Sequence, residues 1–280
     1  MKSISTLISD IQARLTSAEP FEAETVSEFS KNPAAKLAGR LSEERGPPSL
    51  RLSNLGTFCG RKLWYTINTP QDAEPLSAST RLKFLFGDVL EEVLLFLSRA
   101  AGHTVTDEQK EVEINGVKGH IDAIVDGELV DVKSASTYSF NKFKTHGLVY
   151  NDDFGYRDQL GAYRSALGQD RAHFFAVDKT LGHIVLDTHT KEEYDRDFEK
   201  LVDDRRDLLA QPTPPDRAYA DEADGKSGNR KLGVACSYCP FKRSCWPGLR
   251  SFSYSRGPVH LTKVERVPDV PELTGRNAEG

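Results

Sequence analysis

The stretch GHIDAIVDGELVDVKSAS, residues 119–136, constrains the fold more than any other part of the chain. Asp126 and Gly127 separate two short apolar runs. An Asp-Gly pair in this setting predicts a hairpin with a two-residue type I′ turn, because that turn needs a positive φ at both positions. The turn fixes the register of the two strands, so residues 123–125 should lie opposite residues 128–130.

Three charged side chains converge just beyond that turn. The register places Asp122 opposite Asp131, and Lys133 points to the same face of the sheet, opposite His120. Two carboxylates directly opposite each other repel, so we expect a cation to offset the repulsion. Mg²⁺ uses one or two carboxylates and leaves its other positions to water and phosphate oxygens. The hairpin therefore indicates a divalent-metal site; the alternative is two aspartates that repel weakly at a solvated strand end.

The four cysteines form a second constellation. Cys236, Cys239 and Cys245 have the spacing C-x2-C-x5-C, whereas Cys59 lies far upstream in TFCGRKLWY. Disulfides are rare in a reducing compartment, but clustered thiolates bind metals well. Four cysteines with none to spare predict a four-thiolate site, and zinc and an iron–sulfur cluster are both reasonable occupants. The alternative is that the cysteines are ordinary buried apolar residues.

Composition limits the class of protein. The net charge is −5 and charged residues make up 28% of the chain, so no global excess of basic charge indicates nucleic acid. No apolar run approaches the roughly 18–20 residues of a membrane span, and the first residues follow helical spacing rather than a signal-peptide pattern. We therefore expect a cytoplasmic protein that does not associate with a membrane. The chain has no G-x-x-x-x-G-K-[ST] loop, so it carries no visible ATP motor.

The hydrophobic pattern predicts alternating helices and strands around these motifs. A long apolar helix over 78–103 carries Glu91 and Glu92, and at least one of them needs a partner because a buried unpaired carboxylate is costly. A helix ending at Gly168 places Gln159 and Tyr163 on one face. The other expected elements are helices at 3–17, at 23–44 with an interruption at Pro33, and at 188–210, a strand at 108–115, and a second hairpin at 172–188. A further helix is expected to start at the N-cap Ser53 and to carry Cys59, Trp64 and Tyr65.

This ordered set of motifs resembles the RecB-type branch of the PD-(D/E)xK nuclease superfamily. Within it, the chain is most similar to the proteins with a four-cysteine 4Fe–4S cluster, which include the AddB nuclease domain, the iron–sulfur nucleases of CRISPR adaptation and related phage exonucleases. The resemblance covers roughly residues 51–250. It implies an α/β, restriction-endonuclease-like core, with a central mixed β-sheet flanked by helices. We expect residues 1–50 to form a helical N-terminal extension and residues 251–280 a loose C-terminal tail.

The resemblance rests on four motifs and the cysteine pattern. The segment GDVLE fits the first motif, with Gly87 followed by Glu91 where many relatives have histidine, so Glu92 is a rival. Ile121 stands where the superfamily name has proline. The other motifs, GHID, DVK and QLGAY, supply Asp122, Asp131 with Lys133, and Gln159 with Tyr163; Cys59, Cys236, Cys239 and Cys245 match the cluster ligands.

The resemblance also implies roles. Asp122, Asp131 and Glu91 would hold one or two Mg²⁺ or Mn²⁺ ions. Lys133 would orient or help deprotonate the attacking water and counter the developing negative charge. Gln159 and Tyr163 would position the DNA backbone or the water. The cluster would be structural and join the two ends of the core, and the phosphate contacts beside it would be Arg61, Lys62, Lys242 and Arg243.

These roles predict a metal-dependent DNA exonuclease that hydrolyses phosphodiester bonds from DNA ends. Its substrates would be single strands or duplex ends, with 5′→3′ polarity expected, in recombination, end processing or DNA degradation. The expected partners are DNA and a helicase, recombinase or single-strand-annealing protein, in the host cytoplasm if the chain is phage-encoded. The alternative is a non-catalytic DNA-binding iron–sulfur subunit of a larger nuclease or helicase complex. A zinc-stapled scaffold is a third interpretation.

Overall fold

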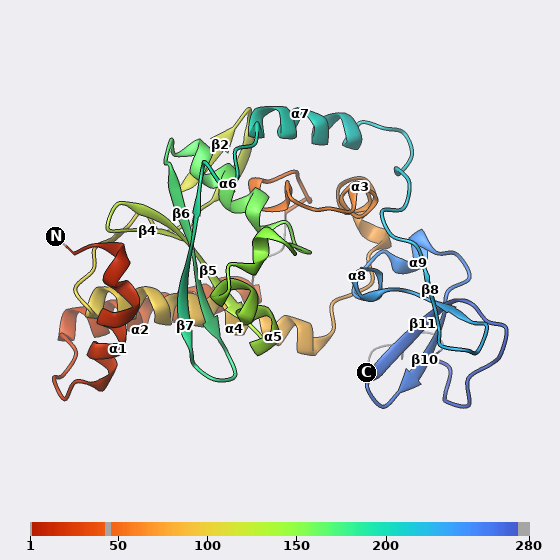
Figure 1. Cartoon of the computed structure of the whole chain (residues 1–280), viewed down its shortest axis with the longest axis horizontal. Coiled ribbons are helices and arrows are strands. Elements are labelled where there is room, and N and C mark those ends of the chain that lie inside the picture. The colour runs from red at the N-terminus through yellow and green to blue at the C-terminus, as the bar shows by residue number, and fades with distance from the viewer. Residues whose placement is uncertain (1, 43–45, 274–280) are drawn as a thin grey trace. The chain divides into compact units, whose positions relative to one another are not determined.

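The computed structural model describes residues 2–42 and 46–273 of the chain (Figure 1). The chain divides into two compact units, which are described separately. The first comprises residues 1–56 and 79–205, and the second comprises residues 57–78 and 206–280.

The first unit is built on a five-stranded sheet with the order β1-β4-β5-β6-β7 (Figure 1). The pair β5–β6 is parallel, and the other neighbouring pairs are antiparallel, so the sheet is mixed. This arrangement confirms the expected α/β architecture with a central mixed sheet. The strands are β1 (Val105–Thr106), β4 (Ala123–Val125), β5 (Glu128–Ala135), β6 (Arg171–Asp178) and β7 (Ile184–Thr190).

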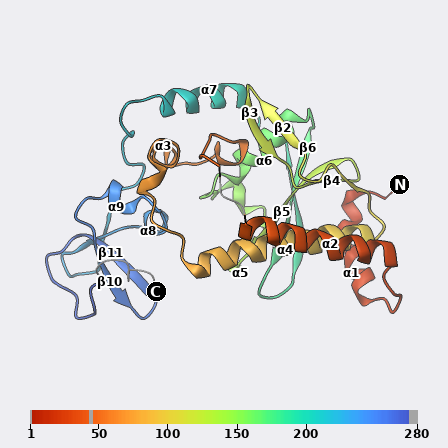
Figure 2. The ribbon, with the colours of Figure 1, turned by 180° about the vertical axis from the view of Figure 1, so that it is seen from behind.

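Helices cover both faces of this sheet. Side chains alternate between the two faces along each strand, so Leu129 and Phe174 join a core with α5, α6 and α7, whereas Val130 and Phe175 join a second core with α1 and α4. Figure 2 shows α2 and α4 crossing the strands on the face turned away from the viewer in Figure 1. The helices are α1 (Leu7–Thr16), α2 (Ala23–Ser42), α4 (Ala78–Ala100), α5 (Thr137–Lys144), α6 (Tyr156–Ala166) and α7 (Phe198–Leu209), with short 3-10 turns η1 (Ile4–Thr6), η2 (Leu52–Asn54) and η4 (Gly147–Val149).

The hairpin has the predicted register on both sides of its turn. Residues 123–125 pair with residues 130–128 in that order, and both turn residues have positive φ, 50° at Asp126 and 89° at Gly127. The expected position of His120 opposite Lys133 is wrong. His120 ends β3 (Val117–His120), which pairs with β2 (Glu111–Ile114) and not with β5.

The reason is a second two-residue turn at Asn115 and Gly116. Both residues have positive φ, 46° and 74°, as a type I′ turn requires. This turn makes β2 and β3 a separate two-stranded sheet. The chain then leaves β3 and enters β4 through Ile121 and Asp122, so Asp122 precedes the hairpin ladder instead of lying within it.

The second unit contains all four cysteines and a four-stranded sheet with the order β10-β11-β9-β8. Two of its strands lie in the segment 251–280, which corrects the expectation of a loose tail there. The strands hold together because Phe252 and Leu261 are buried, 1% and 0% exposed. Residues 274–280 lie outside the described part. The elements are α3 (Gly60–Asn68), η3 (Pro70–Asp72), β8 (Glu222–Ala223), β9 (Arg230–Lys231), α8 (Val234–Ser237), α9 (Lys242–Cys245), β10 (Arg250–Tyr254) and β11 (Gly257–Lys263).

Three predicted helix boundaries differ from the structure. Pro33 lies inside α2, which continues through it. The helix after Ser53 begins only at Gly60, because Cys59 is its N-cap and its sulfur accepts a hydrogen bond from the Lys62 N–H at 3.4 Å. The helix expected from residue 188 begins at Phe198.

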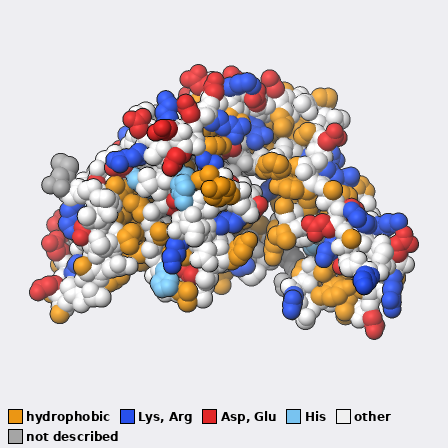
Figure 3. Space-filling model, in the orientation of Figure 1, with side chains coloured by type: hydrophobic (Ala, Val, Ile, Leu, Met, Phe, Trp, Pro, Cys, Tyr) orange, Lys and Arg blue, Asp and Glu red, His pale blue; other side chains and the backbone are white. Residues whose placement is uncertain are grey.

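Two surface properties bear on function. Acidic and basic side chains are interspersed along the upper edge of the space-filling view (Figure 3), and α7 carries both kinds, with Lys200 paired to Asp204. Among the helices that the structure describes, none combines the length and the apolar character that crossing a bilayer requires.

Candidate active site

The hairpin brings Asp122 and Asp131 together at the middle of the sheet. Asp131 lies on β5 and is 1% exposed. Asp122 lies just before β4, where its Oδ2 accepts a hydrogen bond from the Val132 N–H at 2.6 Å. Burial and the negative charges of Asp131 and Glu91 raise the pKa of Asp122 well above its ordinary value. The two carboxylates, one buried and one half-buried, therefore form a site that favours a nearby positive charge.

Lys133 supplies one positive charge to this site. Its Nζ forms an ion pair with Asp131 Oδ2. Burial alone would lower the pKa of Lys133, but the carboxylates of Asp131 and Asp122 outweigh it and raise the pKa. The lysine is therefore held in its charged form.

Two aromatic rings line the other side of this lysine. Lys133 Nζ lies 5.1 Å from the ring centre of Tyr156 and 5.9 Å from that of Phe174. Such rings favour a cation over their faces. Tyr156 was not singled out in the sequence, although it precedes Gln159 by three residues and Tyr163 by seven, a spacing that predicts a shared helix face.

Helix α6 presents Gln159 and Tyr163 to the carboxylates, as the i, i+4 spacing predicts. Gln159 Nε2 donates a hydrogen bond to Asp131 Oδ1 at 3.1 Å. Tyr163 is 2% exposed, and burial together with the charges of Asp131 and Asp122 raises the pKa of its phenol. Tyr163 therefore stays neutral and keeps its proton at physiological pH. Gly119 leaves room for this ring, because a Cβ there would lie 2.6 Å from Tyr163 Cε1.

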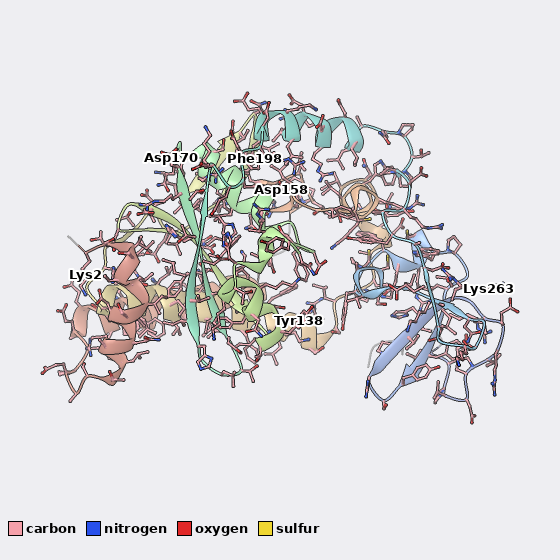
Figure 4. The ribbon with its side chains drawn as sticks, in the orientation of Figure 1. Lys2, Tyr138, Asp158, Asp170, Phe198 and Lys263 are labelled. Carbon is pink, nitrogen blue, oxygen red and sulfur yellow. The ribbon has the colours of Figure 1, made fainter. Side chains whose placement is uncertain are left out.

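Polar contacts at its first turn and on its outer side fix α6 in place. Asp152 accepts hydrogen bonds from the N–H groups of Tyr156 and Arg157, at 2.9 and 2.8 Å, and so caps the helix. Asp158, labelled in Figure 4, accepts hydrogen bonds from Tyr194 Oη at 2.7 Å and from Arg196 Nη1 at 2.6 Å. Since Gln159 is the next residue, these contacts also fix the direction from which it reaches Asp131.

Helix α4 places Glu91 and Glu92 differently. Glu91 Oε1 accepts hydrogen bonds from Lys36 Nζ and from Gln109 Nε2, each at 2.8 Å. Glu92 is 4% exposed, and its Oε1 lies 2.5 Å from Lys36 Nζ. Burial raises the pKa of Glu91, although Lys36 opposes this shift. Both glutamates thus have the partner that their burial requires, and that partner comes from α2, which no motif covers.

The acidic group fits a hard divalent cation. Its charged ligand atoms are carboxylate oxygens, which Mg²⁺ and Mn²⁺ prefer. Apart from its ion pair with Lys133, Asp131 Oδ2 has no hydrogen-bond donor among the described residues. The pKa of Asp122 is raised because Lys133 and the Val132 N–H do not offset the effects of burial and of the charges on Asp131 and Glu91. Asp122 and Asp131, with Glu91 acting on the pKa of Asp122, are the residues that could hold such an ion.

The second unit brings the four cysteines into one neighbourhood. Burial and the thiolates of Cys239, Cys245 and Cys59 raise the pKa of Cys236 to about 11, so all four sulfurs lie within electrostatic reach. All four thiols are free of disulfides. No three of these sulfurs come within 4.8 Å of one another in the described chain. Trp64, Tyr65 and Phe241 form the apolar packing against Cys239 and Cys245.

Three of the four basic residues expected beside the cysteines have partners within the protein. Lys242 forms an ion pair with Glu74, and Arg243 Nε lies 3.1 Å from the other oxygen of Glu74. Arg61 donates a hydrogen bond to the Pro215 carbonyl at 2.8 Å. Lys62 is exposed, and its charge acts on Cys239 by lowering the pKa of that thiol against the larger effect of burial. Of the four, Lys62 is the one that the structure leaves most open to a phosphate.

Comparison with protein families decides the class. Residues 57–246, about two thirds of the chain, match the model of the PD-(D/E)XK nuclease superfamily. The chain belongs to the PD-(D/E)XK nuclease superfamily. Its mixed sheet with flanking helices is consistent with the restriction-endonuclease-like fold of that superfamily, and PD-(D/E)XK nucleases use divalent metal ions.

Two solved structures are similar to this PD-(D/E)XK protein. The crystal structure of SSO0001 aligns with a TM-score of 0.43 and 17% identity, and the alignment covers 79% of this chain and 96% of SSO0001. The crystal structure of an alkaline exonuclease, LHK-Exo from Laribacter hongkongensis, aligns with a TM-score of 0.30 and 14% identity, covering 74% and 82% of the two chains. A search of curated proteins finds no match.

Proposed function

We propose that this PD-(D/E)XK protein is a metal-dependent DNA exonuclease. The observation that supports the proposal best is the convergence of Asp122, Asp131 and Lys133, with Gln159 bound to Asp131. Placing a half-buried carboxylate beside a buried one costs stability, and metal-assisted hydrolysis is a function that requires this cluster. A non-catalytic DNA-binding subunit would have no need to keep it.

The proposed reaction is hydrolysis of a phosphodiester bond. A water oxygen attacks phosphorus, the bond from phosphorus to one ester oxygen breaks, and the water's protons end on the leaving oxygen and in solution. A divalent ion held by Asp122, Asp131 and Glu91 would activate the water and neutralise charge on the phosphate. Lys133, which is ion-paired with Asp131, would orient or help deprotonate the water and donate hydrogen bonds to developing negative charge.

The residues on α6 complete the site. Gln159 keeps Asp131 in one orientation through its hydrogen bond. Tyr163 remains a neutral phenol beside the carboxylates and can donate its proton to water or to a phosphate oxygen. Both are therefore proposed as positioning residues for the water and the DNA backbone.

We also propose a 4Fe–4S cluster bound by Cys59, Cys236, Cys239 and Cys245. Four neighbouring thiols without disulfides support a metal centre. The number of cysteines and their C-x2-C-x5-C spacing, together with distant Cys59, support the iron–sulfur group. Lys62 is the proposed phosphate contact beside it.

The remaining features of the function are also proposals. The expected polarity is 5′→3′, on single strands or duplex ends, in recombination, end processing or DNA degradation. A helicase, recombinase or single-strand-annealing protein is the proposed partner. Residues 51–250 are the proposed catalytic region, and the family match over residues 57–246 supports this boundary.

The experiment compares linear with circular DNA. Single- and double-stranded molecules, labelled at the 5′ or the 3′ end, are incubated with Mg²⁺, Mn²⁺ or a chelator. An exonuclease releases labelled nucleotides from linear DNA only, and the order of release gives the polarity. Cleavage of closed circles at the same rate as linear DNA would show that the protein is an endonuclease and not an exonuclease. Binding without any cleavage in either metal would favour the non-catalytic subunit.

A further inference from the structure

Two histidines and an aspartate meet at a place that the proposed nuclease chemistry does not use. His146 lies between α5 and η4, whereas Asp187 and His189 are two residues apart on β7 and therefore point to one face of the sheet. Asp187 Oδ1 lies 2.6 Å from His146 Nδ1, and Asp187 Oδ2 lies 3.0 Å from His189 Nε2. The three ligand atoms that these residues offer all lie within 4.8 Å of one another.

The charge of this group is unbalanced when its histidines are neutral. Asp187 is buried at 4% exposure, and a second carboxylate, Glu193, has its Oε2 at 4.0 Å from His146 Nε2. Glu193 Oε2 accepts a hydrogen bond from the Thr190 N–H at 3.0 Å, which favours its charged form. Two carboxylates beside two neutral imidazoles carry a charge of −2. Arg164 on α6 acts on Glu193, so the charge still to be offset is centred on Asp187, where a cation would bind.

The geometry is close to that of a metal site. The two imidazole rings stack with centroids 4.5 Å apart and an interplanar angle of 30°, so both turn a nitrogen toward Asp187. Metal–ligand bonds of about 2.0–2.1 Å in a tetrahedron would separate the ligand atoms by about 3.3 Å. The contacts of 2.6 and 3.0 Å therefore need to open by about 0.7 and 0.3 Å to admit an ion.

In each histidine, the ring nitrogen that does not face Asp187 has surroundings compatible with metal binding. His146 Nε2 faces Glu193, and a carboxylate in that place orients a metal-bound imidazole. In the metal-free structure His189 Nε2 carries the proton that faces Asp187, and His189 Nδ1 has no hydrogen-bond partner among the described residues, so the proton can move to Nδ1 when Nε2 binds an ion. The side chain of His146 is 38% exposed, which leaves a path for the ion and a position for water.

We propose that His146, Asp187 and His189 bind one borderline transition-metal dication, with zinc as its representative. Two imidazoles and one carboxylate suit zinc, whereas the all-oxygen set at Asp122 and Asp131 suits Mg²⁺ or Mn²⁺. The ion ties the segment after α5 to β7. The His189 ring also packs edge-on against Phe174, with ring centroids 5.3 Å apart and an interplanar angle of 79°. The ion therefore stabilises the position of Phe174, whose ring lies beside Lys133.

The test measures zinc uptake and does not use nuclease activity. Wild-type protein, His146→Gln and Asp187→Asn are titrated with zinc against a chromophoric chelator, and zinc content is measured after dialysis. Zinc held by the cysteines is common to all three proteins and cancels in the comparison. We expect one zinc fewer in each variant, with affinity lower by at least about 100-fold. His183→Gln is the matched control, since His183 is an exposed histidine just before β7.

Two further readouts keep the proposal falsifiable. Zinc should raise the melting temperature of wild type but not that of His146→Gln, and zinc uptake should fall in acid because protons compete for the imidazoles. Because His146 is half-buried, His146→Gln is expected to fold. It therefore tests metal binding even if Asp187→Asn does not fold. Equal zinc content and affinity in wild type and His146→Gln would overturn the proposal and leave a metal-free hydrogen-bonded group.

Discussion

Lys36 Nζ on α2 lies 2.8 Å from Glu91 Oε1 on α4. The same ammonium lies 2.5 Å from Glu92 Oε1, so one lysine compensates two neighbouring acids. Glu91 is the proposed third ligand of the catalytic metal. A helix of the N-terminal extension therefore contacts the acidic site directly, and the extension is part of the structure that positions it.

Replacing Lys36 with alanine should destabilise the protein. The substitution leaves Glu91 and Glu92 close together without a cation, and removing one partner of a buried pair is costly. Because Lys36 is 28% exposed, we expect a loss of about 2 kcal/mol instead of the full cost of a buried pair. Urea unfolding measures it, with exposed Lys31→Ala on the same helix as the control. Equal stability of the two variants would show that the pairs with Lys36 contribute little.

Substitution of the two glutamates should separate their roles. Glu91→Gln is expected to need at least about tenfold more Mn²⁺ for half-maximal cleavage, because it loses a charged metal ligand. Glu92→Gln should keep its metal requirement, because the ion pair with Lys36 accounts for the burial of Glu92. Cleavage rates over a Mn²⁺ titration give both values. The reverse pattern would show that Glu92, and not Glu91, is the metal ligand on α4.

The raised pKa of Asp122 predicts how stability depends on pH without metal. The folded protein keeps the Asp122 proton to higher pH than the unfolded chain does. Stability from this group is therefore lost as pH rises upward from about 4, the ordinary value for aspartate. Asp122→Asn removes the effect, so with chelator present the variant should melt at a higher temperature than wild type at pH 8.

The control for this pH experiment is Asp153→Asn, which changes an aspartate that is 63% exposed. Its melting temperature should follow wild type across the pH series. The account of Asp122 is contradicted if Asp122→Asn also follows wild type from pH 4 to pH 8, since the folded state would then bind no extra proton at that site.

Local chemistry explains why part of this site could be predicted from the sequence. The turn at Asp126 and Gly127 depends on two adjacent residues, and its register follows from the pleat of the strands. The helical period likewise places Gln159 and Tyr163 on one face. The fold class was predictable because these local units come in an order that matches the superfamily.

Contacts between distant segments could not be predicted in this way. Lys36 and Glu91 are 55 residues apart, and nothing in the local pattern of α2 marks Lys36 as a partner. His146 and Asp187 are 41 residues apart and have no ligand spacing, so their meeting depends on the packing of α5 against β7. The Asn115-Gly116 pair is itself a signal for a type I′ turn, and the β2–β3 hairpin that it forms takes His120 away from Lys133.

Each cysteine should contribute equally to the proposed cluster. Binding of a metal centre by Cys59 and the three cysteines at 236–245 makes its formation free energy part of the folding free energy. Any single Cys→Ser protein, prepared without oxygen, should lose iron and visible absorbance and melt lower by on the order of 10 °C. Ser244→Ala is the control within the same segment. Full iron content in Cys59→Ser would exclude Cys59 from the ligand set.

The central claim is that Asp131 and its neighbours hold a metal ion that cleaves DNA. The most direct measurement is the release of nucleotides from linear DNA in Mn²⁺ by wild type, Asp131→Asn and the exposed α7 control Asp207→Asn. We predict cleavage by wild type and the control that stops with chelator, and a rate at least about 1000-fold lower in Asp131→Asn, the size expected for losing a metal-held transition state. Cleavage by folded Asp131→Asn near the wild-type rate would contradict the account.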